Sequence, residues 1–233
     1  MRVVSWNIQY GIESELAAAE IAAAPEMRDF DLLLLQEMDE PGTAIVAERL
    51  GASYTYSTAG PHANTGRDFG NAVVTRWPIR RNAEVPLPHR ATVSGQPRSA
   101  THAIVHVGEH EVSAYSVHTE IPALRLARRI EQFATVAADA DWHPIDLVVV
   151  GGDFNTVTDR GTRALTRTLG RAGLERMSST PSYRRGGRDL SLDHIFARGF
   201  TSSTTGVVTG TTASDHAPLW VELELPDPGD GGS

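Results

Sequence analysis

Polar residues that could carry chemistry follow apolar segments at several points of this sequence. The clearest case is the segment 147–155, in which four branched apolar residues precede Gly151, Gly152, Asp153 and Asn155. Four consecutive apolar residues are typical of a strand buried on both faces, and two glycines allow a sharp turn after it. A carboxylate and an amide at such a strand end could act on a substrate, although Asp and Asn also favour turns through local hydrogen bonds.

The same arrangement recurs at the ends of other expected strands. A carboxylate that is drawn into the interior by its strand needs a partner charge or a metal ion, and histidine suits proton transfer near neutral pH. Strand ends that meet at one edge of a sheet would gather such groups from distant parts of the chain. The candidates found in this way are Asn7, Glu37, His118, Asp153, Asn155, Asp193, Asp215 and His216.

The composition excludes several classes of chemistry. The 233 residues contain no cysteine, so disulfides and thiolate metal sites are excluded and the available ligands are oxygen and imidazole. They contain no lysine either, which excludes a Schiff base on a lysine. The chain lacks the phosphate-loop, dinucleotide, His-Glu-x-x-His and Gly-x-Ser-x-Gly motifs, which argues against nucleotide-loop kinases, zinc proteases and serine hydrolases.

The formal net charge of −8 argues against non-specific attraction to nucleic acid, although a local basic groove is compatible with it. No segment has the pattern of a signal peptide or the length of a bilayer-spanning run, so we expect a cytoplasmic protein without a membrane partner. We further expect a monomer with one domain over residues 1–225 and a disordered tail over residues 226–233.

The elements that must position the candidate residues are mostly strands, which favours two packed sheets flanked by helices over a strictly alternating parallel fold. An irregular basic loop is expected at 178–187. Strands are expected at 2–7, 31–36, 53–57, 71–75, 80–85, 99–107, 111–117, 147–150, 190–197 and 219–225, and helices at 13–24, 43–50 with Thr43 as its cap, 123–140 and 162–169.

Seven short motifs, taken in order, resemble those of the endonuclease/exonuclease/phosphatase superfamily over residues 3–222. The resemblance implies an α+β fold, a four-layer α/β/β/α sandwich of the DNase I-like type. It also implies a phosphoester hydrolase that depends on Mg²⁺, with Mn²⁺ as a substitute. The motifs are Ser-Trp-Asn-Ile (5–8), Leu-Gln-Glu (35–37), Gly-Asn-Ala-Val-Val-Thr-Arg (70–76), Ser-Val-His-Thr (116–119), Gly-Asp-Phe-Asn (152–155), Leu-Asp-His-Ile-Phe (192–196) and Ser-Asp-His (214–216).

The resemblance assigns the metal ligands. Glu37 corresponds to the principal metal carboxylate, with Asn7 and Asp215 near the same ion or a second one. Mg²⁺ prefers hard oxygen ligands and retains several waters, so one or two direct carboxylates are sufficient to bind it.

The resemblance also assigns catalytic roles. Asp153 corresponds to the residue that orients or deprotonates the attacking water, and Asn155 to the one that holds the transition-state oxygens. His216 is implied at the phosphate, as a base or as a donor, with Asp193 fixing its tautomer. His118 is implied to donate to a non-bridging oxygen or to assist the leaving group. The choice of general base between Asp153 and His216 stays open at this point.

Three residues are candidates for substrate binding. Arg98 stands where relatives often place an arginine near the phosphate, and Asn71 follows a Gly-Asn pattern of the superfamily. Arg184 lies in the basic segment 181–188, where arginines and an aromatic residue could grip a polyanion or stack on a base. Alternatively, Arg98 is a solvated arginine at the start of a strand, and Asn71 is a turn-forming residue. The segment that contains Arg184 is alternatively a solvated loop. The motif at 129–132 is interpreted as scaffold.

These observations favour a phosphodiesterase or phosphatase that acts on a small phosphorylated metabolite. A DNA endonuclease or exonuclease of the same superfamily is the alternative, with nucleic acid as its partner. A binding module without catalytic activity is the third hypothesis, and it is weakened because none of the metal or phosphate residues is replaced.

Overall fold

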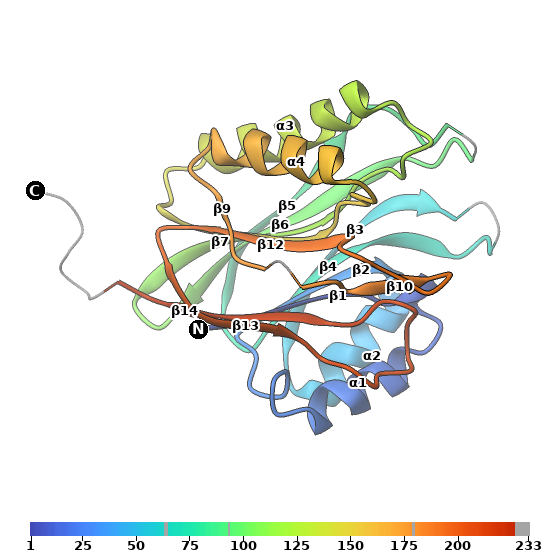
Figure 1. Ribbon diagram of the computed structural model, residues 1–233. Helices are drawn as coiled ribbons and strands as arrows, with labels where there is room; N and C mark the ends of the chain where they lie inside the picture. The colour runs from blue at the N-terminus through green and yellow to red at the C-terminus, as the bar shows by residue number, and fades with distance from the viewer. Residues whose placement is uncertain (63–64, 93, 179, 227–233) are drawn as a thin grey trace, which may run out of the picture.

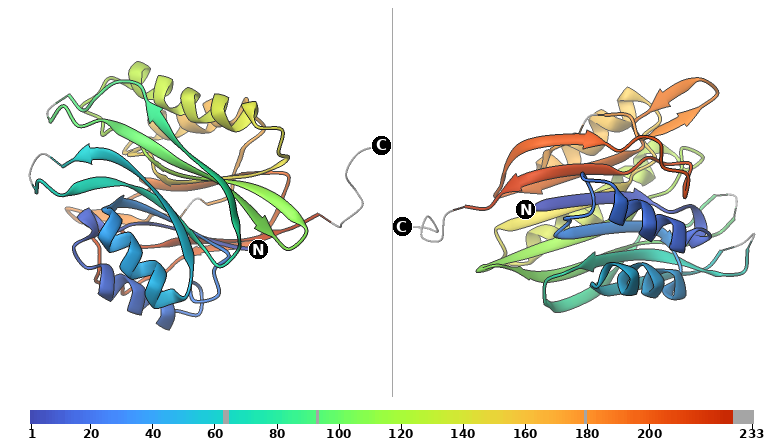
Figure 2. Two further views of the ribbon diagram at one scale, coloured as in Figure 1. Left: turned by 180° about the vertical axis from the view of Figure 1, so that it is seen from behind. Right: turned by 90° about the horizontal axis from the view of Figure 1, so that it is seen from below.

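The computed structural model describes residues 1–62, 65–92, 94–178 and 180–226. Two six-stranded sheets pack face to face, and a pair of helices covers the outer face of each sheet (Figure 1). The views from behind and from below show the two helix pairs on opposite sides of the sheets (Figure 2). The expected four-layer α/β/β/α sandwich is therefore confirmed. All but the first residue of the expected tail, 226–233, lies outside the described residues.

The first sheet contains the N-terminal and C-terminal strands side by side. Its central pair, β1 and β2, is parallel, and its other pairs are antiparallel. In spatial order its strands are β13 (Thr201–Val207), β14 (Leu219–Glu224), β1 (Arg2–Asn7), β2 (Leu32–Met38), β4 (Asp68–Thr75) and β3 (Ser53–Pro61).

The second sheet repeats this plan, with a parallel pair, β7 and β8, among antiparallel neighbours. A separate two-stranded hairpin is formed by β10 (Tyr183–Arg185) and β11 (Arg188–Leu190). The strands of the second sheet are β5 (Ile79–Leu87), β6 (Arg98–Val107), β7 (His110–His118), β8 (Leu147–Asp153), β12 (Asp193–Arg198) and β9 (Glu175–Arg176).

The helices pack through alanine and branched residues. Helices α1 and α2 cover the first sheet, and α3 and α4 cover the second. Within the described ranges, none of the helices is both long and apolar enough to cross a bilayer. Their bounds are α1 (Ser14–Ala23), α2 (Glu40–Leu50), α3 (Leu126–Trp142) and α4 (Asp159–Gly170), with a short 3-10 turn η1 (Gln9–Gly11) after β1.

Alternation along the strands divides the apolar residues between two cores. Leu32 and Leu34 of β2 face the layer between the sheets, whereas Leu33 and Leu35 face α1 and α2. A strand that is buried on both faces reads as a continuous apolar run, which is the pattern seen in β2 and β8. The polar residues at the ends of these strands are therefore carried by the most deeply buried parts of the fold.

The two sheets lie close together near the ends of their parallel pairs. A Cβ atom at Gly151 would lie 2.6 Å from Leu34 Cδ1 and 3.4 Å from the Ser5 Cβ of the facing sheet. A polar contact crosses the same layer, where Gln36 Nε2 donates to Ser116 Oγ at 2.9 Å. Ser116 in turn donates to the carbonyl of Leu35 at 2.7 Å. The strand ends of both sheets are thereby held at one common edge.

Three expectations about local structure are wrong. Asp39, not Thr43, caps α2, because its carboxylate accepts from Gly42 N at 2.8 Å and the Thr43 hydroxyl donates instead to the Asp39 carbonyl. The segment expected as an irregular loop contains the β10–β11 hairpin, whose turn glycines both have positive φ. Strand β13 was not expected, because its polar sequence has no apolar alternation.

We predict that Gly152→Ala strongly destabilises the fold. Gly152 has φ +155°, and an added Cβ would lie 1.9 Å from the carbonyl oxygen of Val117 on the neighbouring β7. Because backbone atoms cannot yield as a flexible side chain does, the expected loss is about 3 kcal/mol or more. Urea unfolding of the purified variant measures it. Gly170→Ala is the control, since a Cβ there meets nothing within 4 Å. Equal stability of both variants would contradict the prediction.

Candidate active site

A cavity of about 430 Å³ opens at the common edge of the two sheets. The parallel strands β1, β2, β7 and β8 end here, and β12 begins here. Of the candidates from the sequence, Glu37, Arg98, His118, Asp153, Asn155, Asp215 and His216 line this cavity.

Asn7 links the two sheets beneath the cavity. Its Nδ2 lies 3.2 Å from Glu37 Oε1 and 3.1 Å from Asp153 Oδ2, so one amide donates to a carboxylate from each sheet. Its Oδ1 accepts from the backbone N–H of Gln9 at 3.0 Å. For Asn7 to bind a metal ion through its oxygen, the side-chain amide must flip, because its nitrogen faces the carboxylates here.

Glu37 occupies a bulge at the end of β2. The register with β4 shifts between Gln36 and Met38, and Glu37 itself has φ 58°. A non-glycine residue in this region of backbone space is uncommon and is worth relating to function. Because of the bulge, the Glu37 side chain lines the cavity, while the Met38 side chain stays in the core beside α1 and α2. Burial raises the pKa of Glu37, and the hydrogen bond from Asn7 opposes this shift.

His118 ends β7 between the two carboxylates. Its Nε2 lies 3.7 Å from Asp153 Oδ2 and 3.9 Å from Glu37 Oε1. Burial, and then the positive charge of Arg98, lowers the pKa of His118 well below its ordinary value. The ring is therefore neutral at physiological pH. Arg98 Nη1 lies 3.3 Å from both ring nitrogens, and the Phe69 ring packs against His118 at 5.6 Å between centroids.

A tight turn after β8 presents Asp153. The backbone N–H of Asn155 donates to Asp153 Oδ1 at 2.8 Å, and Asn155 adopts φ 52°. Arg129 of α3 holds this turn from behind by donating to the carbonyls of Phe154 and Asn155 at 2.7 and 2.8 Å. Asn155 Nδ2 donates to the Thr119 carbonyl at 3.0 Å. Since an amide nitrogen carries two hydrogens, a second donor remains on Asn155.

Asp193 and His216 form a hydrogen-bonded pair beside Asp153. His216 Nδ1 lies 2.8 Å from Asp193 Oδ2, and its Nε2 lies 3.9 Å from Asp153 Oδ2. The hydroxyl of Ser182 donates to the same oxygen of Asp193. The loop before β14 is fixed by the Trp6 indole, which donates to the His216 carbonyl at 2.8 Å, and by Ser214, whose hydroxyl donates to the Asn7 carbonyl.

The charges around His216 determine its protonation. Burial alone would lower the pKa of His216, but the carboxylates of Asp193, Asp153 and Asp215 outweigh burial and raise it to about 10. Burial, and then the negative charge of Asp193, raises the pKa of Asp153. The His216 ring is therefore an imidazolium at neutral pH, and it lies next to the Asp153 carboxyl group, which accepts a proton readily.

The three residues predicted to bind substrate have different surroundings. Arg98 lines the cavity, with its Nε 2.8 Å from Glu120 Oε2. Asn71 is buried away from the cavity lining and donates to the Ser99 carbonyl at 2.8 Å, which connects the two sheets. Arg184 is exposed, pairs with Asp189 at 3.6 Å and faces a neighbouring hollow. Its neighbour Arg185 lines the cavity instead, because consecutive strand residues alternate between faces.

Aromatic rings form two walls of the cavity. On one side, the ring of Tyr10 packs on His62 at 4.5 Å, and His62 packs on Phe69 at 5.1 Å. On the other side, the Tyr183 ring lies 4.6 Å from that of His216. Of these cavity residues, the sequence interpretation included His216 and, as the aromatic residue of the basic segment, Tyr183. Tyr10, His62 and Phe69 stood in expected loops, where no periodicity marked them.

The chemistry of the donors suits a hard divalent cation. Glu37, Asp153, Asp193 and the exposed Asp215 bring four carboxylates around two histidines. The raised pKa values of Glu37 and Asp153 follow from burial that the surrounding cations do not compensate. One potential ligand atom from each of Asp153, Asp193 and His216 lies within 4.8 Å of the other two. Because His216 Nδ1 is already bonded to Asp193, we interpret His216 and Asp193 as a hydrogen-bonded pair beside Asp153, with the cation closer to Glu37.

Several solved structures share this fold. A mannosyl-6-phosphatase of Bacteroides thetaiotaomicron is 19% identical, with a TM-score of 0.75 over 97% of this chain and 100% of that one. A sphingomyelinase C of Streptomyces griseocarneus is 19% identical, with a TM-score of 0.72 over 95% and 98%. A humanised D. rerio TDP2 is 15% identical, with a TM-score of 0.76 over 96% and 98%.

The sequence comparison is more specific than the shared fold. The family model described as Endonuclease/Exonuclease/phosphatase family matches residues 4–216. The match begins in β1 and ends at His216, so it includes every strand end that lines the cavity. The chain belongs to the endonuclease/exonuclease/phosphatase family.

Proposed function

We propose that this protein is a Mg²⁺-dependent hydrolase of small phosphorylated metabolites, acting on a phosphomonoester or phosphodiester. Members of its family are hydrolases that act on phosphoesters. The observation that carries the proposal is the grouping of Asp153 with the hydrogen-bonded His216–Asp193 pair beside Glu37. Such a grouping supplies water activation and charge stabilisation at one point, as phosphoryl transfer requires.

Glu37 is the proposed principal ligand of the cation, with Asp215 at the cavity mouth and Asn7 as further ligands. When bound, Mg²⁺ would neutralise negative charge on the phosphoryl oxygens. With Mn²⁺, which accepts similar oxygen ligands, the same residues are expected to function. Glu37 is well placed for this role because the bulge in β2 fixes its backbone at the cavity. Asn7 Nδ2 donates to its carboxylate at 3.2 Å, and a flip of that amide would release the carboxylate and turn the Asn7 oxygen to the cation.

Asp153 is the proposed group that orients and deprotonates the attacking water. Its Oδ1 is held by the Asn155 N–H, which leaves Oδ2 to face the cavity between His118 and His216. His216, held as an imidazolium by Asp193, is then a donor to a phosphoryl oxygen rather than a base. Its raised pKa supports this division of roles, which the sequence left open.

The groups around Asp153 and the His216–Asp193 pair complete the phosphate site. His118 is neutral and carries one N–H, so it can donate to a non-bridging oxygen or to the leaving group. The second amide hydrogen of Asn155 is the proposed donor to the transition-state oxygens. Arg98 and Arg185 line the same cavity and add positive charge for the phosphate.

The dimensions of the cavity favour a small substrate. A volume of about 430 Å³ is in the range of pockets for small molecules, and the aromatic walls leave the phosphate site at the base of a confined space. A nuclease requires cations that contact several consecutive phosphates. Around this cavity Arg98 is already paired with Glu120, and the whole chain has a net charge of −8. DNA cleavage is therefore the second candidate.

We predict that Asp153→Ala and His216→Ala each lower turnover by on the order of a hundredfold or more, because a positioned proton-transfer or charge-stabilising group is lost. The assay is hydrolysis of p-nitrophenyl phosphate, bis-p-nitrophenyl phosphate, inositol phosphates and sugar phosphates with Mg²⁺, Mn²⁺ or EDTA. Near-normal activity of either variant would defeat its assigned role. Nicking of supercoiled plasmid without hydrolysis of the small esters would instead favour the nuclease. No activity on any substrate would favour a binding module.

We predict that Glu37→Gln moves the midpoint of the Mg²⁺ titration to higher concentration, by on the order of tenfold or more. The change keeps the size of the side chain and its contact with Asn7 but removes the negative charge. Activity measured against Mg²⁺ concentration gives the midpoint. An unchanged midpoint with reduced turnover would remove Glu37 from the ligands of the cation.

We predict that the His216 ring remains protonated at pH 8 in EDTA and loses its proton only as the pH approaches 10. The sign follows because the surrounding carboxylates favour the charged ring more than burial disfavours it. NMR titration of the histidine ring signals measures this, with Asp193→Asn expected to lower the His216 pKa. A wild-type pKa at or below the ordinary value of 6.5 would contradict the assignment of His216 as a donor.

A further inference from the structure

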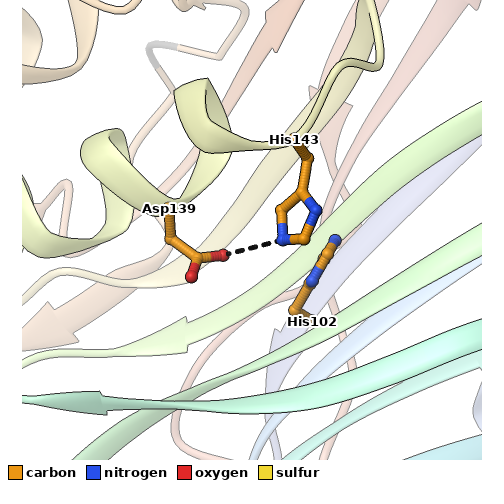
Figure 3. A group of neighbouring side chains, drawn as sticks. All are labelled: His102, Asp139 and His143. Carbon is orange, nitrogen blue, oxygen red and sulfur yellow. Dashed lines mark ion pairs between the residues drawn. The ribbon is translucent and has the colours of Figure 1, made fainter.

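A second group of metal-binding side chains lies outside the catalytic cavity. His102 of β6, Asp139 of α3 and His143 just after α3 converge on the outer face of the second sheet, as the close view shows (Figure 3). Their ligand atoms all lie within 4.8 Å of one another. His143 Nε2 is 3.7 Å from Asp139 Oδ1, and the rings of His102 and His143 are 4.5 Å apart. None of the three lines the cavity around Asp153.

Neighbouring residues fix two of these side chains in place. His102 Nε2 is hydrogen-bonded to Ser113 Oγ at 2.8 Å, and its ring stacks on Tyr115 at 4.3 Å with an angle of 7° between the planes. The Tyr115 hydroxyl donates to Asp139 Oδ1 at 2.9 Å. Histidines and carboxylates that bind metals are usually oriented by second hydrogen bonds of this kind. In the tautomer in which His102 Nε2–H donates to Ser113, Nδ1 carries the free lone pair that a metal ion requires.

The electrostatics of the site favour a cation. Helix α3 ends at Trp142, and the exposed carbonyls of a helix C-terminus carry partial negative charge. The last turn of α3 has no basic residue, whereas Asp139 adds a full negative charge there. Burial lowers the pKa of His102 to about 4, so the ring is neutral at pH 7, as a ligand must be.

We propose that His102, Asp139 and His143 bind a divalent first-row transition-metal ion of the Zn²⁺ type, at a site separate from the catalytic cation. Two imidazoles and one carboxylate suit Zn²⁺, Co²⁺ or Ni²⁺, whereas Mg²⁺ prefers an all-oxygen shell. His102 is buried, but the side chains of Asp139 and His143 are 31% and 29% exposed, which gives the ion access from solvent and room for water ligands. The ion would tie the end of α3 to β6.

The test is titration of EDTA-treated full-length protein with ZnCl₂, in excess Mg²⁺, by isothermal titration calorimetry. Wild type is expected to bind one more equivalent of Zn²⁺ than His143→Ala or Asp139→Asn, or to bind that equivalent at least tenfold more tightly. These two residues are chosen because they are partly exposed and their replacement spares the core. Ser113→Ala, which removes the hydroxyl that is hydrogen-bonded to His102, is expected to weaken the same equivalent about tenfold.

His106→Ala is the matched control, because His106 lies on the same strand β6, is partly exposed and pairs with Glu111 instead. It should bind Zn²⁺ as wild type does. As a second measurement, the ring NMR signals of His102 and His143 should shift on addition of Zn²⁺ while that of His106 does not. Equal stoichiometry and affinity in wild type and His143→Ala, or a wild-type Kd above about 1 mM, would overturn the proposal and leave the three residues as structural. The measured quantity is metal binding, so failure of phosphoester hydrolysis does not affect the result.

Discussion

The active-site residues come from two different sheets, and they can meet only because the sheets approach closely where their parallel strand pairs end. Gly151 is central to that approach, since a Cβ there would collide with Leu34 of the facing sheet. The Gln36–Ser116 hydrogen bond spans the same layer and fixes the two sheets relative to each other. With the layer this thin, Asn7 of one sheet reaches Asp153 of the other at 3.1 Å.

This close packing also sets the electrostatics of the site. Carboxylates from both sheets are held close together where they are largely buried, and burial raises the pKa values of Glu37 and Asp153. Asp193, Asp153 and Asp215 keep His216 charged, whereas burial and then the charge of Arg98 keep His118 neutral. Two histidines a few ångströms from one carboxylate thus hold different protonation states, because burial disfavours the charged ring in both and only His216 has carboxylates enough to outweigh it.

The sequence predicted the parts of the site that buried strands carry. Glu37, His118 and Asp153 each follow an apolar run, and that run fixes where the strand ends. The contributions of loops were harder to foresee. Arg184 and Arg185 are adjacent, and only the register of the β10–β11 hairpin decides which one faces the cavity.

Contacts between distant segments were beyond local patterns altogether. Asn71 was predicted as a substrate-binding residue from its Gly-Asn motif, and no local pattern indicated that its amide donates to the Ser99 carbonyl of the other sheet. The pairing of Arg98 with Glu120 and the contact of Tyr10 with His62 depend on how the loops fold over the edge of the sheets. No periodicity in the sequence encodes these contacts.

The order of assembly during synthesis follows from another contact of this kind. The Ser214 hydroxyl bonds to the Asn7 carbonyl across 207 residues of sequence, and β1 can complete its pairing only with β14. Contacts of such separation form slowly, since a long stretch of chain must first be ordered. A chain emerging from the ribosome would therefore carry Asn7, Glu37, His118 and Asp153 long before His216 joins them, and it would complete the candidate active site only at a late stage of folding.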